Sequence, residues 1–162
     1  MQRVKSEVRL LLDALDEAFD RRSWHGTNLH GSLRGVTASQ ASWRLAPGRH
    51  NIQEIAVHAA YWKYVVRRVI TGGKRGSFPL RGSNWFAREG EDALAWRRDL
   101  QLLAGQHREL REAVAALPAI RLHLPTRKRG FTYAGLIRGV AAHDLYHAGQ
   151  IQLLKRLRVT AG

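Results

Sequence analysis

Hydrophobic residues recur at every third or fourth position through most of this chain, the spacing that places them on one face of an α-helix. Four long stretches carry the pattern: one from the N-terminus to about residue 22, then about 52–71, 91–116 and 132–158. Strict alternation of hydrophobic and polar residues, typical of a β-strand, never extends beyond a few positions. We therefore predict an all-α protein whose four long helices form a four-helix bundle.

Local signals predict where several helices begin and end. Asn51, with Glu54 three positions later, is typical of a helix start. Gly72 is the kind of residue that ends a helix. A short extra helix is expected near the N-terminus, around residues 29–36, and the motif Thr37-x-x-Gln40 could cap a further turn. These signals leave the four long helices as the main elements of the fold.

Length and composition limit the classes of site. The chain of 162 residues is expected to form a single domain over 1–162, and it is long enough to bury a hydrophobic core without cross-links. It has no cysteine, which excludes disulfides, thiolate zinc sites, iron–sulfur clusters and a cysteine nucleophile. Any metal ion must therefore be held by histidine, carboxylate or water.

The net charge of +14 raises the question of nucleic-acid binding. The basic residues are mostly arginines scattered along the helices, and no recognition helix or aromatic RNA-binding motif accompanies them. We therefore expect the arginines to lie on solvated helix faces, and we do not expect nucleic acid to be the partner. Such a basic surface nevertheless attracts anions. No secretory leader or membrane-spanning stretch is visible, so a cytoplasmic protein is expected.

Three of the eight histidines lie in line with hydrophobic positions. His143 and His147 are one helical turn apart within the hydrophobic stripe of the last helix, and His58 lies in the stripe of the second long helix. Each alone is typical of an ordinary core histidine, but together they could place three imidazoles around one metal ion. The remaining ring N–H groups would then need acceptors. The local candidates are Glu54, Asp144 and Gln150.

Two segments give these histidines a family context. AAHDLYHAGQIQLLKRL at 141–157 and PGRHNIQEIAVHAAYWKYVVRRVITG at 47–72 resemble the DinB/YfiT-like superfamily of metal-binding proteins. The similarity extends over essentially the whole chain, and the histidine set is its specific part. It implies an up-down-down-up bundle, often dimeric, whose divalent metal is held by His58, His143 and His147 plus water. Nickel or zinc is favoured, with iron or manganese as alternatives.

The resemblance also implies a range of activities. Three neutral imidazoles leave coordination positions open, which suits catalysis better than a purely structural role. Related proteins include transferases that use small thiols, so the hypotheses are a metal-dependent transferase acting with a low-molecular-weight thiol, or a hydrolase of a small substrate. The alternative is a non-catalytic metal-binding module for stress response or interaction. Homodimerisation is expected from the resemblance, and no catalytic residue is assigned.

Several neighbouring residues carry weaker expectations. Trp62, one turn from His58, is expected to form a wall of the site, and the long polar loop at 72–90 could cover a substrate or bury a dimer contact. Trp24 is expected to pack in the core and Tyr146 between helices. His107 lies alone in a hydrophobic stripe and is expected in the core.

Overall fold

The protein is described from a computed structural model that covers residues 2–128 and 130–160. The four long helices are α1 (Gln2–Phe19), α4 (Ile52–Thr71), α5 (Ala93–Ala115) and α6 (Tyr133–Thr160). Two short helices, α2 (Leu29–Leu33) and α3 (Ala38–Ser42), precede α4, and a 3-10 turn, η1 (Ala119–Arg121), follows α5. The described residues form no β-strand, only an isolated bridge between Pro125 and Thr132. The all-α prediction is confirmed.

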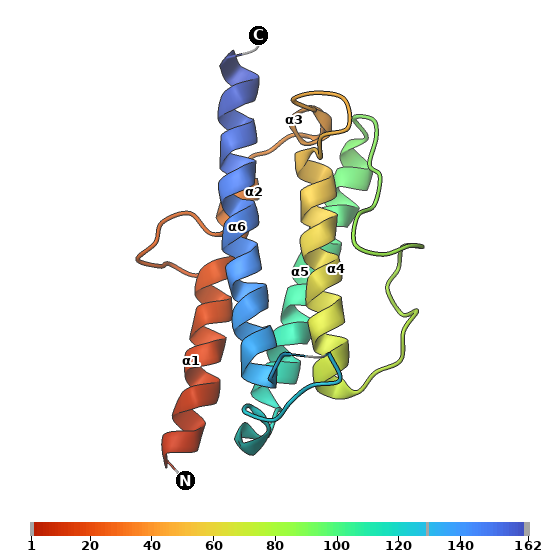
Figure 1. Cartoon of the computed structure of the whole chain (residues 1–162). Helices are drawn as coiled ribbons and strands as arrows, with labels where there is room; N and C mark the ends of the chain where they lie inside the picture. The colour runs from red at the N-terminus through yellow and green to blue at the C-terminus, as the bar shows by residue number, and fades with distance from the viewer. Residues whose placement is uncertain (1, 129, 161–162) are drawn as a thin grey trace.

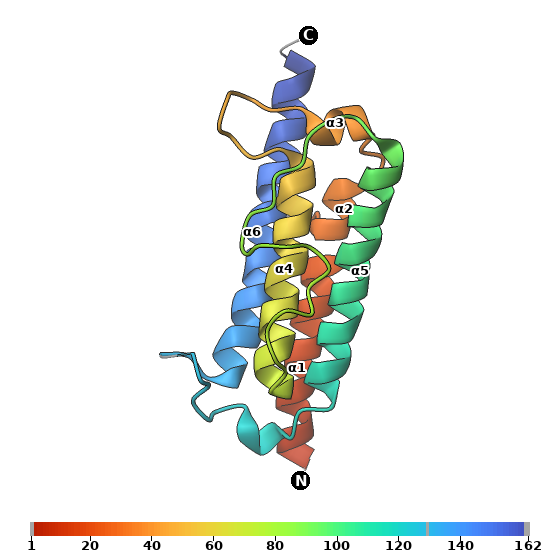
Figure 2. The same ribbon diagram turned by 90° about the vertical axis from the view of Figure 1, so that its right-hand side faces the viewer.

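The long helices run up, down, down and up in chain order, as the resemblance implied (Figure 1). Because α4 and α5 run in the same direction, the chain must return along the full bundle between them. The segment 72–92 makes this return and crosses the side of α4 that the other long helices leave uncovered (Figure 2). The parallel pair therefore places a long irregular segment beside the middle of α4.

The predicted caps form at the predicted residues. The side chain of Asn51 accepts a hydrogen bond from the Glu54 amide at the start of α4, and Gly72 ends this helix in the left-handed region at φ +73°. Thr37 and Gln40 form a reciprocal capping box at the start of α3, which is a second short helix in addition to α2. Glu54, by contrast, does not complete a box with Asn51, because its carboxylate is engaged elsewhere.

Helix α4 lies at the centre of the packing. All residues from 51 to 60 are buried, so this part of the helix is covered on every side rather than along one stripe. Helices α5 and α6 pack against it, and the loop 72–92 covers the remaining side through Phe78 and Phe86, whose rings contact Tyr61 at 5.3 and 5.5 Å between centroids. The loop is thus fixed to the bundle by its own aromatic residues.

A layer of charged and polar groups divides the core into two hydrophobic clusters. Each long helix contributes one buried group to it, and the four are Asp16, Lys63, His107 and Asp144. The cluster on one side includes Ile55, Leu103 and Ile151, and the cluster on the other includes Leu110 and Ile137.

The expectation for Trp24 is wrong. Its side chain is 101% exposed, because residues 20–28 form a loop between α1 and α2 with no helical face to direct it inward. Tyr146 does not pack between helices either, since it lies on the outer face of α6 and is 64% exposed. None of the helices in the described part of the chain is long and apolar enough to cross a membrane.

Candidate metal centre

The structure brings together the three histidines that the sequence singled out. His58 comes from the middle of α4, and His143 and His147 come from successive turns of α6. The Nε2 atom of His143 lies 3.0 Å from Nε2 of His58 and 3.0 Å from Nε2 of His147. A metal–imidazole bond is about 2.0–2.1 Å long, so nitrogens at this separation are close enough to share one ion. His58 and His147 are buried and His143 is half-buried.

Two of the three rings are oriented by hydrogen bonds from their other nitrogen. His58 Nδ1 donates to the backbone carbonyl of Asn84 at 2.8 Å, and His147 Nδ1 donates to Oε1 of Gln150 at 2.6 Å. Gln150 was one of the three predicted acceptors, whereas Asn84 was not predicted. The Nδ1 atom of His143 is buried and has no hydrogen-bond partner among the described residues.

These hydrogen bonds fix which nitrogens carry protons. A neutral imidazole has one N–H, so the protons of His58 and His147 are on Nδ1 and their Nε2 atoms carry bare lone pairs. Both lone pairs point at Nε2 of His143, which can donate one proton at most. At least one pair of facing nitrogens is therefore unsatisfied by hydrogen bonding, whereas a cation between the three would accept all their lone pairs.

Burial keeps the three rings neutral. It lowers the pKa of His143 to about 3, assisted by the neighbouring His147, His58 and Lys63, and it lowers the pKa of His147 to about 4. The pKa of His58 is also lowered, again mainly by burial. Neutral imidazole is the form that binds metal ions, so near neutral pH protons hardly compete for these nitrogens.

Two tryptophans form the walls of the cluster. The ring of Trp85 stacks on His58 at 3.8 Å between centroids, and His50 stacks on the opposite face of Trp85 at 3.6 Å. Trp62 faces His58 edge-on and donates its indole N–H to the Asn84 side chain at 2.9 Å, as expected for a wall residue. Asn84 has a φ of +65°, which turns its carbonyl and its side chain toward the two α4 residues.

A buried carboxylate holds this wall in place. Glu54 accepts two hydrogen bonds from Arg44, at 2.6 and 2.9 Å, and one from His50 at 2.9 Å. Burial alone would raise the pKa of the Glu54 carboxyl, but these bonds and the Arg88 amide outweigh it and hold the pKa at about 2. Glu54 thus anchors His50, rather than accepting from a metal-binding histidine as predicted.

Asp144 also has a different role from the predicted one. It forms a fully buried ion pair with Lys63, and Nζ of Lys63 also lies 3.4 Å from Nδ1 of His107. His107 is in the core as expected, stacked on Phe19 at 3.8 Å. Asp16, on the other side of His107, accepts hydrogen bonds from Arg111 at 2.7 and 3.0 Å. Because Asp144 follows His143 in α6 and Lys63 helps to lower the pKa of His143, the polar layer adjoins the histidine cluster.

The fold and the cluster together define a class of protein: an up-down-down-up helical bundle in which the second and fourth long helices form a candidate three-histidine metal centre. A family model of the DinB superfamily matches residues 21–151, and the chain belongs to this superfamily. The comparisons with curated proteins and with solved structures give no match.

Proposed function

We propose that this protein is a divalent-metal-dependent enzyme whose ion is held by His58, His143 and His147, with nickel or zinc favoured and iron or manganese as alternatives. The observation that carries the proposal is the convergence of three neutral Nε2 atoms, two with their Nδ1 protons already engaged. Hydrogen bonding among the three rings cannot satisfy this arrangement, and the donor set suits a divalent first-row metal.

The chain's own residues provide the setting for chemistry. Asn84 and Gln150 orient two of the ligands, and Trp85 shields one face of His58. Three protein ligands leave coordination positions open, and an ion bound there would lower the pKa of a bound water or thiol and polarise a carbonyl group. His143 also lines a groove at the protein surface, which gives a small molecule access to the cluster.

The reaction class is the finer part of the proposal. An open three-histidine site supports transfer to or from a low-molecular-weight thiol, or hydrolysis of a small substrate, and membership of the DinB superfamily is consistent with the first. Assembly as a homodimer and a single domain over 1–162 stay predictions, since both rest on the resemblance and on chain length.

The test is metal analysis of untagged protein, with His143→Ala as the variant. We expect about one first-row metal ion per chain in the unmodified protein and a loss of metal together with turnover in the variant, while the helical circular dichroism persists. His25→Ala is the matched control, because His25 is exposed and, among the described residues, its side chain forms a hydrogen bond only with Ser23.

Each alternative outcome is decisive. A folded His143→Ala protein that retains stoichiometric metal would overturn the ligand assignment. Stoichiometric metal whose removal lowers the melting temperature, without turnover on panels of thiol acceptors and esters, would overturn the enzyme assignment and favour the non-catalytic module.

A further inference from the structure

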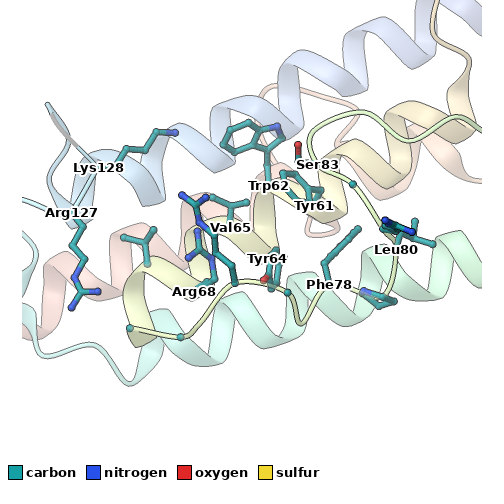
Figure 3. Close-up of a pocket in the computed structure, with 18 of the residues that line it drawn as sticks. Tyr61, Trp62, Tyr64, Val65, Arg68, Phe78, Leu80, Ser83, Arg127 and Lys128 are labelled. Atoms are coloured by element: carbon teal, nitrogen blue, oxygen red, sulfur yellow. The ribbon is translucent and has the colours of Figure 1, made fainter.

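A large cavity lies between α4, the returning loop and the segment before α6. Its volume is about 1220 Å³, and Figure 3 shows Arg68, Tyr64 and Val65 of α4 along its length, with Arg127 and Lys128 at one end and Phe78 and Leu80 of the loop at the other. We refer to it as the basic basin, because six of its lining residues are cationic. These six are Arg68, Arg75, Arg81, Arg121, Arg127 and Lys128.

No carboxylate balances these charges. The residues that line the basic basin include no Asp or Glu, and within the described part of the chain none of its six cations forms an ion pair. This contrasts with Arg67, the neighbour of Arg68 in α4, which turns the other way and pairs with Glu109 at 2.7 Å. Nε of Arg68 is buried without a hydrogen-bond partner among the described residues. The unpaired charges are thus concentrated in one concave place.

A smaller, apolar groove continues from the basic basin to the metal centre. Its volume is about 150 Å³, it lies between α4 and α6, and it is lined by His143 and mostly by hydrophobic side chains. Trp62 and Lys128 line both spaces, and Nζ of Lys128 lies 4.8 Å from the centre of the Trp62 ring. Lys128 therefore marks the junction at which a positively charged space becomes an apolar one.

We propose that the basic basin and the apolar groove together bind the substrate, a small molecule with a phosphate or carboxylate group at one end and an apolar stem that reaches His143. The role as substrate rests on the function proposed above, whereas the binding itself does not. An oxyanion is the chemistry that several arginines recognise best, through paired charge-assisted hydrogen bonds. An apolar cavity of about 150 Å³ has room for one benzene ring.

The arrangement favours a small molecule over nucleic acid. The charges line a concavity in which Tyr61, Tyr64 and Phe78 pack against one another. The cations of Lys128 and Arg121 lie over its other two aromatic rings, Trp62 and Tyr133, at 4.8 and 4.6 Å from the ring centres. The aromatic rings are therefore engaged within the protein rather than presented for stacking bases. A polyanion would also gain from every basic surface of a protein with a net charge of +14, whereas a small anion gains mainly where unpaired cations converge.

Phenyl phosphate and inorganic phosphate are the probes, and calorimetric titration of chelator-treated protein at constant ionic strength is the measurement. We expect Arg68→Gln/Arg127→Gln to weaken both probes by roughly tenfold or more. Arg97→Gln/Arg156→Gln is the matched control, since it removes the same charge from exposed positions outside the basin. Arg127→Gln alone, at an exposed residue, serves if the double variant does not fold. Equal weakening by the two double variants would reduce the effect to general charge and overturn the proposal.

Gly139 of α6 provides a separate test of the groove. It lines the groove, and a Cβ built there meets nothing within 4 Å, so the Cβ of Gly139→Leu causes no clash and we expect its side chain to occupy the groove. We expect this variant to weaken phenyl phosphate by roughly tenfold while leaving inorganic phosphate unchanged. Gly149→Leu, at an equally open glycine of α6 outside the groove, should affect neither probe.

The outcomes separate this inference from the proposed function. The assigned role of the groove would be overturned if phenyl phosphate bound no more tightly than inorganic phosphate. It would also be overturned if Gly139→Leu left the affinity for phenyl phosphate unchanged. Because the titrations use metal-free protein, they can succeed even if the metal analysis fails, and the reverse is equally observable.

Discussion

The buried pair of Lys63 and Asp144 gives the sharpest prediction about stability. Both side chains are completely buried, and among the described residues His107 is the one further hydrogen-bonding neighbour of Lys63. Removing one member of a buried pair leaves an uncompensated charge, which costs about 3–5 kcal/mol, whereas removing both leaves none. We therefore expect Lys63→Met and Asp144→Asn each to be strongly destabilising, and the double variant to be far less destabilised than their sum.

The cost of losing Lys63 should also depend on pH. Burial raises the pKa of Asp144 to about 6 even with Lys63 beside it. Without Lys63 the Asp144 carboxyl can become neutral by taking up a proton. The loss of unfolding free energy caused by Lys63→Met should therefore be smaller at pH 6 than at pH 8.

Urea unfolding of metal-free protein, followed by circular dichroism, measures these free energies. In a chain of this size, about 1 kcal/mol corresponds to roughly 2–4 °C in melting temperature, so a single variant should melt about 6–20 °C lower. Single variants that cost under about 1 kcal/mol, or a double variant whose cost equals the sum, would refute the reasoning.

Three further predictions follow from other parts of the structure. Burial, with Lys63 and Arg111, lowers the pKa of His107 from 6.5 to about 3, so between these values only the unfolded chain takes up this proton and the stability falls as the pH falls. Between pH 6 and 4 the metal-free protein should lose up to ~1.4 kcal/mol more stability per pH unit than the His107→Gln variant. Equal pH slopes of the unfolding free energy in urea titrations would contradict this account. Glu54→Gln should cost about 2 kcal/mol in urea unfolding and release the wall at Trp85, seen as altered tryptophan fluorescence; an unchanged spectrum would argue against Glu54 as the anchor. Gly72→Ala should cost about 1 kcal/mol because its φ of +73° is unfavourable for any side chain, and an unchanged melting temperature would contradict that account.

The sequence predicted most of the fold because helical periodicity and caps are local properties. Asn51 and Gly72 bound α4 as expected, and the four-residue step from His143 to His147 was enough to place both on the inner face of α6. The position of His58 in its stripe then brought the third histidine to the same side of the bundle.

The residues that the sequence missed depend on contacts between distant segments. Asn84 lies in an irregular loop, and nothing local shows that its carbonyl reaches a histidine 26 positions earlier. A lysine such as Lys63 is typical of a solvated face. The local signal that could have indicated a helix covered on all sides is the stretch from Ile52 to Trp62, which is mostly hydrophobic. Trp24 was misjudged because its size favours burial, while its loop offers no partner.

The return of the chain along α4 has a consequence for folding. The three-histidine cluster needs partners 26 and 85 positions away from His58, so it cannot form in any fragment that lacks the loop or the last helix. An ion can bind all three histidines only after α4 and α6 have packed together, so it cannot stabilise an early folding intermediate. Metal should therefore slow unfolding more than it speeds refolding, because its binding site forms late in folding.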